Sequence, residues 1–268
     1  MAKAQTFEWL ARAGYVARGV VFLLTAGLAL FSTLGARRPE TKSALDTLLG
    51  QPLGRIWLTL IAIGLLGFVA WRLAQAVANA DHHERGAKGG MIRLALFGSA
   101  IAYIGLSLYA FSHAWGLGYG RGEGEKGLAS WAMAQPFGAY LAAAIGLGFV
   151  IGGGITIFKG VSRNFERYLN LADRRPLTLI CVYGLVSRGI LFAIVGILFC
   201  YAAFTVDPDK AGSMGDALAW LRSLPFGAVL YAFVALGLAA FGFYNFVEAR
   251  YRIIQTPDAG TIPSKLPV

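Results

Sequence analysis

Charged residues are scarce in this chain. They make up 14% of its 268 residues, where soluble domains carry about 25%. Histidine occurs three times and cysteine twice, and Cys181 and Cys200 lie nineteen residues apart in one apolar run. A helix rises about 1.5 Å per residue, so these two cysteines cannot form a disulfide with each other. The HExxH and GxSxG patterns are absent as well. We therefore expect no catalytic site, no metal site and no cofactor.

Apolar residues take the place of charge, at 57% of the chain with a mean hydropathy of +0.60. A helix needs about 20 apolar residues to cross the roughly 30 Å of hydrocarbon in a bilayer. Membrane barrels use alternating strands of only ~10 residues, so long uninterrupted runs favour helices. The composition predicts an all-α membrane protein with six transmembrane helices, near residues 14–34, 56–78, 92–114, 137–160, 177–204 and 226–249.

The sequence repeats itself three times. A Gly-x3-Arg-Gly element at residues 14–19 returns at 184–189, and a Pro-x-Gly element occurs at 52–54, 136–138 and 225–227. Two spans per copy give every copy the same orientation, so the copies should be related by an axis along the membrane normal. We predict pseudo-threefold symmetry among three parallel two-helix units, residues 8–80, 91–170 and 178–252.

This pattern resembles the domain-of-unknown-function family 1206, whose members carry three two-helix membrane repeats. The Gly-x3-Arg-Gly and Pro-Phe-Gly elements carry the resemblance, which covers roughly residues 8–252. The second copy departs from it, because Ala102 and Tyr103 stand where the first copy has Arg18 and Gly19. The resemblance implies a membrane protein and no particular activity.

A short amphipathic segment precedes each Pro-x-Gly element, at residues 43–50, 127–134 and 213–223. Two of these segments carry a tryptophan five residues before the proline, Trp131 and Trp220. Tryptophan favours the headgroup region, where its ring is buried and its N–H stays hydrated. The proline can begin the next helix without losing a hydrogen bond. We therefore expect an interfacial helix on the outer membrane face in every copy.

The basic surplus of the chain, a net charge of +10, is interpreted as a topology signal and not as a nucleic-acid surface. The N-terminus, second loop, fourth loop and tail carry 13 Lys and Arg residues, and the other three loops carry 8. The positive-inside rule then places both termini in the cytoplasm, with the protein in the cytoplasmic (inner) membrane. Anionic headgroups should contact this basic face. Residues 253–268 are expected to form a mobile cytoplasmic tail.

Polar side chains are predicted to form one layer near the cytoplasmic ends of the helices. An uncompensated charge in hydrocarbon costs at least ~2.5–3.5 kcal/mol, so such residues are the candidates for function. They could snorkel to the headgroups, or they could face inward as a cluster in which Glu248 pairs with Arg18 or Arg188. Counting along the helices places these residues in the layer: Arg18, Arg72, Gln75, Lys159, Arg188, Asn245 and Glu248.

Glycines crowd the fourth predicted helix. Small residues let helices approach closely, so we expect ordinary membrane packing there. The glycines are Gly146, Gly148, Gly152, Gly153 and Gly154.

Two functions remain open. A non-catalytic membrane module that interacts with lipids or with a protein partner agrees with the interfacial helices and the basic face. The alternative is a small-solute or ion transporter or channel along the pseudo-threefold axis. A conducting path needs polar lining along its length, and the outer halves of the helices offer little of it. We favour the first hypothesis.

Overall fold

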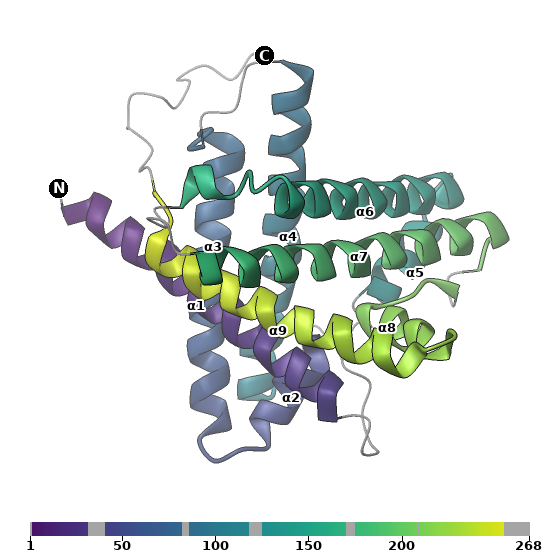
Figure 1. The fold of residues 1–268 in the computed structure, drawn as a ribbon, viewed down its shortest axis with the longest axis horizontal. Helices are drawn as coiled ribbons and strands as arrows, with labels where there is room; N and C mark the ends of the chain where they lie inside the picture. The colour runs from purple at the N-terminus through teal and green to yellow at the C-terminus, as the bar shows by residue number, and fades with distance from the viewer. Residues whose placement is uncertain are drawn as a thin grey trace.

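The computed structural model of the chain describes residues 2–31, 41–81, 86–117, 125–169, 175–207 and 210–254 (Figure 1). Within these ranges the chain consists of helices joined by short turns, with one isolated β-bridge between Leu169 and Arg252. The predicted tail lies almost entirely outside the described residues. The long helices are α1 (Ala2–Phe31), α3 (Gly54–Val77), α4 (Ala87–Trp115), α6 (Gly138–Val161), α7 (Arg175–Thr205) and α9 (Gly227–Tyr251). The short ones are α2 (Thr41–Leu49), α5 (Glu125–Met133) and α8 (Met214–Ser223), with a 3₁₀ turn, η2 (Glu166–Tyr168).

The six long helices confirm the predicted membrane architecture. Each is long and apolar enough to cross a bilayer. All their backbone groups can bond within the helix, which is the condition for crossing hydrocarbon. The chain is an integral membrane protein.

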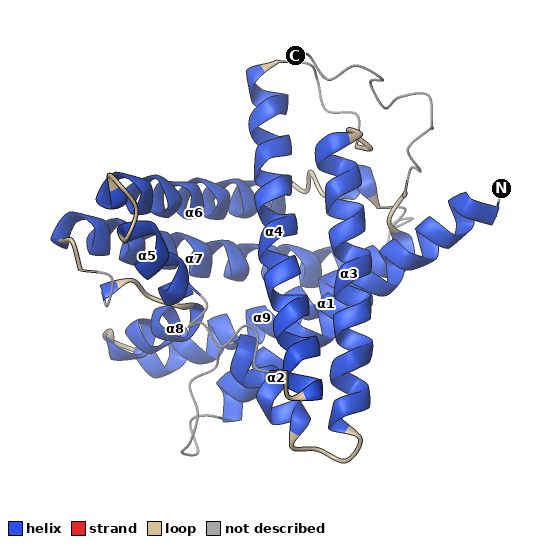
Figure 2. Cartoon of the chain, turned by 180° about the vertical axis from the view of Figure 1, so that it is seen from behind, coloured by secondary structure: helices blue, strands red, loops and turns tan. Residues whose placement is uncertain are grey.

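The long helices pack against one another in the order α4–α3–α1–α9–α7–α6. The first unit packs α1 on α3 and the third packs α7 on α9, but in the second unit α4 packs on α3 while α6 packs on α7. In Figures 1 and 2 the α3–α4 pair and the α6–α7 pair accordingly run in different directions, with α1 and α9 between them. The long helices therefore form one continuous series of neighbours from α4 to α6, and the predicted pseudo-threefold symmetry is not confirmed.

Glycine pairs explain why α6 packs on α7. A Cβ added at Gly153 would lie 2.6 Å from the Gly189 carbonyl oxygen, and one added at Gly146 would lie 2.8 Å from that of Gly196. Only glycine allows so close an approach of two helices. The packing expected for the glycine cluster holds at these two positions. It does not hold at Gly148, Gly152 and Gly154, which face open space.

The three Pro-x-Gly elements form one repeated junction between a short helix and a long one. The residue between proline and glycine has a left-handed backbone in every copy, with φ of 61° at Leu53, 61° at Phe137 and 59° at Phe226. The following glycine begins the long helix, so the proline lies in the turn before the helix and does not begin it. A side chain on that glycine would collide with the end of the short helix.

Candidate functional site

The residues of the predicted polar layer come from five of the long helices: Arg18 from α1, Arg72 and Gln75 from α3, Lys159 from α6, Arg188 from α7, and Asn245 and Glu248 from α9. Four of them are buried: Arg18, Gln75, Asn245 and Glu248. The other three are half-buried. The structure divides the layer into two groups, one around carboxylates and one around aromatic rings.

The first group is an ion-pair network centred on Arg252. Its guanidinium donates to Glu248 Oε1 at 2.6 Å and to Asp81 Oδ2 at 3.0 Å. Gln75 also donates to Asp81 Oδ2, at 2.5 Å, and accepts from Arg72 Nη1 at 3.2 Å. The prediction that Glu248 pairs with Arg18 or Arg188 is therefore wrong. Glu248 instead binds the arginine four residues further along its own chain, because the Arg252 amide still donates to the Glu248 carbonyl at 3.0 Å and so keeps both side chains on one face of α9.

Aromatic rings enclose the Arg252 guanidinium. Its central carbon lies 5.6 Å from the Tyr15 ring, 5.7 Å from the Trp71 ring and 5.4 Å from the Tyr168 ring. Burial alone would lower the pKa of Arg252, but Tyr15 and the carboxylates of Glu248 and Asp81 raise that pKa above its ordinary value. The Ile253 amide also donates to the Tyr168 carbonyl at 3.0 Å. The network thus joins the C-terminal ends of α9 and α3 and the N-terminal half of α1 to the segment that follows α6.

The second group consists of Arg18 and Arg188 among aromatic rings. Arg18 lies 5.7 Å from the centre of the Phe22 ring and 5.0 Å from that of Phe241. Arg188 lies 5.9 Å from Phe22 and 4.7 Å from Phe241. Arg18 Nε donates to the Tyr103 hydroxyl at 2.6 Å. The two arginines of the repeated Gly-x3-Arg-Gly element therefore point inward and meet at the same pair of rings.

The remaining layer residues make local contacts. Lys159 Nζ lies 5.7 Å from the Tyr168 ring. Asn245 donates to the Phe241 carbonyl at 2.6 Å, while its own side-chain oxygen is buried without a hydrogen-bond partner. Within the described ranges, no group of three His, Cys, Asp or Glu residues could hold a metal ion.

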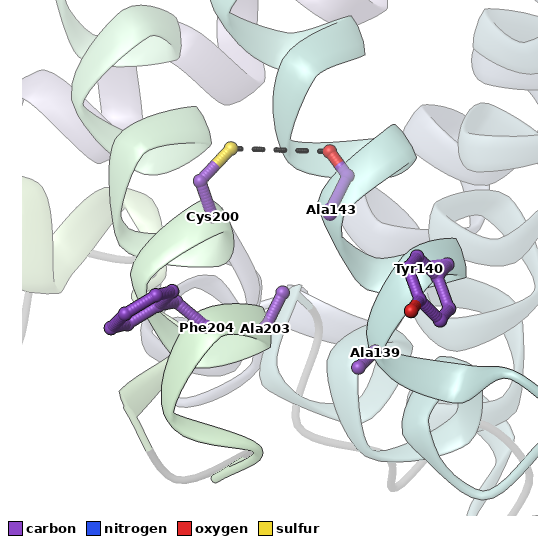
Figure 3. Close-up of a pocket in the computed structure, with 6 residues that line it drawn as sticks. All are labelled: Ala139, Tyr140, Ala143, Cys200, Ala203 and Phe204. Atoms are coloured by element: carbon purple, nitrogen blue, oxygen red, sulfur yellow. Dashed lines mark hydrogen bonds between the residues drawn. The ribbon is translucent and has the colours of Figure 1, made fainter.

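A shallow apolar pocket of about 410 Å³ lies at the other end of the molecule, between α6 and α7 (Figure 3). Alanine and aromatic side chains line it, together with Cys200, whose thiol lies 3.9 Å from the Ala143 carbonyl oxygen. Such a surface suits an acyl chain better than a polar substrate.

Two members of the network, Arg252 and Asp81, are not among the seven residues that the sequence predicts for the layer. The spacing of Glu248 and Arg252 by four residues is a signal that could have found the pair, because such residues meet on one face of a helix.

The family model of the Domain of Unknown Function DUF1206 matches the chain in three segments, residues 13–79, 94–163 and 183–252. One similar protein is "Uncharacterized protein YxxB" from Bacillus subtilis (strain 168), which is 32% identical over 260 residues, 93% of this chain and 94% of that protein. No solved structure matches the chain.

Proposed function

The chain belongs to the DUF1206 family, and we propose that it is a non-catalytic membrane module that binds and organises lipids. Its partners are the lipids of the cytoplasmic (inner) membrane, with anionic headgroups at a cytoplasmic face that carries both termini. The distribution of basic residues, 13 against 8, supports this orientation.

The observation that carries the proposal is the repeated outer junction. Leu53, Phe137 and Phe226 are exposed by 65%, 80% and 86%, although each is a large apolar residue. Each also has a left-handed backbone, which costs a non-glycine residue about 1–2 kcal/mol. A strained conformation repeated three times, each time projecting an apolar side chain, is explained if these side chains insert among lipids.

The neighbouring tryptophans support the same interpretation. Trp131 on α5 and Trp220 on α8 are exposed on the short helices that end at two of the junctions. An aromatic side chain with a polar N–H favours the headgroup region. Each of these two units therefore presents an interfacial tryptophan and, after the turn, a deeper apolar anchor.

Spin-labelled phospholipids test this proposal in reconstituted bilayers. The triple variant Leu53→Ala/Phe137→Ala/Phe226→Ala should reduce the fraction of motionally restricted lipid. A matched triple variant removes residues of the same types from exposed positions elsewhere on the spans: Leu66→Ala, Phe158→Ala and Phe243→Ala. It should reduce that fraction less. Equal effects of the two triples would contradict the proposal, and a solute flux through the reconstituted protein would favour the transporter instead.

A further inference from the structure

We propose that Arg18 and Arg188, with Arg72 beside them, form a binding site for a phosphate group. The group is either that of a phospholipid headgroup in the cytoplasmic leaflet or that of a free phosphate ion. The inference deepens the proposed lipid interaction, and it rests on that function for the lipid source. It concerns the inner end of the bundle, whereas the junctions above lie at the outer end.

The charges of the inner layer do not balance within the described part of the chain. Three of its carboxylates are already engaged: Glu8 by Arg12 at 2.7 Å, and both Glu248 and Asp81 by Arg252. Arg18, Arg72, Lys159 and Arg188 form no ion pair with a described carboxylate. Several cations thus remain at membrane depth, where each uncompensated charge costs at least ~2.5 kcal/mol.

Aromatic contacts offset only part of this cost. Arg188 lies 4.2 Å from the Phe192 ring, Arg18 lies 4.8 Å from the Phe68 ring, and Arg72 lies 4.7 Å from the same Phe68 ring. A cation–π contact contributes about 0.5–2 kcal/mol. It also satisfies none of the N–H groups of a guanidinium, which are five donors in a fixed plane. The rings hold the guanidinium groups in place but leave their hydrogen-bonding capacity unused.

Unpaired donors show this unused capacity directly. Nε of Arg188 and Nε of Arg72 are buried and have no hydrogen-bond partner. Arg18 is 3% exposed, and its hydrogen bond within the described residues is the one from Nε to Tyr103. Buried N–H groups without acceptors are rare in native proteins and indicate an acceptor that is still to be supplied.

Phosphate fits these donors in shape and charge. The guanidinium fork matches two phosphate oxygens in a bidentate pair, and such charged hydrogen bonds are among the strongest in proteins. Arg18 and Arg188 both lie beside the Phe22–Phe241 ring pair, whose centres are 4.8 Å apart. One anion could therefore form ion pairs with both guanidinium groups. Arg188 is half-buried and therefore the point of access, while Arg18 lies deeper.

Native mass spectrometry of the protein released from nanodiscs tests the lipid source. Nanodiscs of phosphatidylglycerol and phosphatidylcholine should leave phosphatidylglycerol bound to the natural chain. Arg188→Gln and Arg18→Gln should each weaken this retention by about tenfold or more, the value of one charged hydrogen bond. Arg250→Gln is the matched control, because Arg250 is an exposed arginine at the same end. A glycolipid without phosphate should show no such dependence on Arg188.

Titration of the delipidated protein with inorganic phosphate tests the free-ion source. Binding that is weakened by Arg188→Gln but not by Arg250→Gln would assign the site to free phosphate. If Arg188→Gln does not fold, Arg188→Lys keeps the charge and removes the fork, and it should still weaken binding.

The proposal is overturned if the Arg188 variants match Arg250→Gln in both arms, or if glycolipid is lost to the same extent. That outcome would leave the outer-junction experiment, and with it the proposed function, untouched.

Discussion

Removing Arg252 should destabilise the protein more than any other single truncation in the ion-pair network. Glu248 is buried, Asp81 is half-buried, and both are bound to this one guanidinium, so Arg252→Ala would leave two carboxylates without a cation. Breaking a buried ion pair from one side costs about 3–5 kcal/mol. The loss of contact with three aromatic rings adds to this. We expect about 5 kcal/mol.

Glu248→Ala should cost less, about 3 kcal/mol, because Asp81 stays on Arg252 and compensates its charge. The double variant Glu248→Ala/Arg252→Ala should then be clearly less destabilised than the sum of the two single variants. Residues in direct contact couple by about 0.5–3 kcal/mol, and a short buried pair belongs at the upper end. Thermal unfolding of the reconstituted protein, followed by tryptophan fluorescence, gives the order of the variants.

Arg250→Ala is the control, because it removes an exposed arginine two positions earlier, in the last turn of α9. It should lie close to the natural protein, since exposed charges contribute little. If Arg252→Ala is as stable as Arg250→Ala, the network does not hold the helix ends together. If the double variant is simply additive, Glu248 and Arg252 are not partners.

Three further outcomes are expected. Gly153→Ala should destabilise the protein by about 1–3 kcal/mol in thermal unfolding, because its Cβ would overlap α7, whereas Gly148→Ala on the same helix should be silent. Tyr103→Phe should cost about 1.5–3 kcal/mol, because a buried guanidinium loses its acceptor, and an unchanged melting temperature would show that water replaces it. In a cysteine-free background, an impermeant thiol reagent should label Arg167→Cys only from the cytoplasmic side and Ser223→Cys only from outside, and the reverse would invert the topology.

The sequence predicts the elements of this fold well because each depends on local chemistry. Apolar length sets the six spans, and the Pro-x-Gly elements mark the three junctions at Gly54, Gly138 and Gly227. The helix order was harder to predict, because it depends on which face of each helix meets which neighbour. The glycines of α6 illustrate this: adjacent members of one cluster, Gly152 and Gly153, face open space and α7 respectively. The cluster alone does not show which of its glycines contact a neighbouring helix. That becomes clear only when Gly189 and Gly196 on α7 are known to be the partners.

The pairing within the polar layer could not be predicted from the sequence. Counting 1.5 Å per residue gives a position along each helix but not the partner of a side chain. Pairing depends on side-chain direction and on where a helix stops. Arg252 caps α9 with its amide bonded to the Glu248 carbonyl, so its guanidinium lies beside Glu248. Asp81 comes into reach for a similar reason, since α3 ends at Val77 and the chain turns there.

The second copy of the repeat contributes to the site without adding a third buried cation. A third arginine at the position of Ala102 would have added another cation at membrane depth, at a further cost of at least ~2.5 kcal/mol. The copy instead supplies Tyr103, whose ring lies 5.4 Å from the Arg18 guanidinium and whose hydroxyl accepts from it. One side chain thus contributes both a π face and an acceptor without adding charge. The place where the repeated element is lost is therefore also the place where α4 contributes to the site around Arg18. In this copy, which has no arginine at the position of Arg18 and Arg188, α4 packs on α3 and α6 packs on α7.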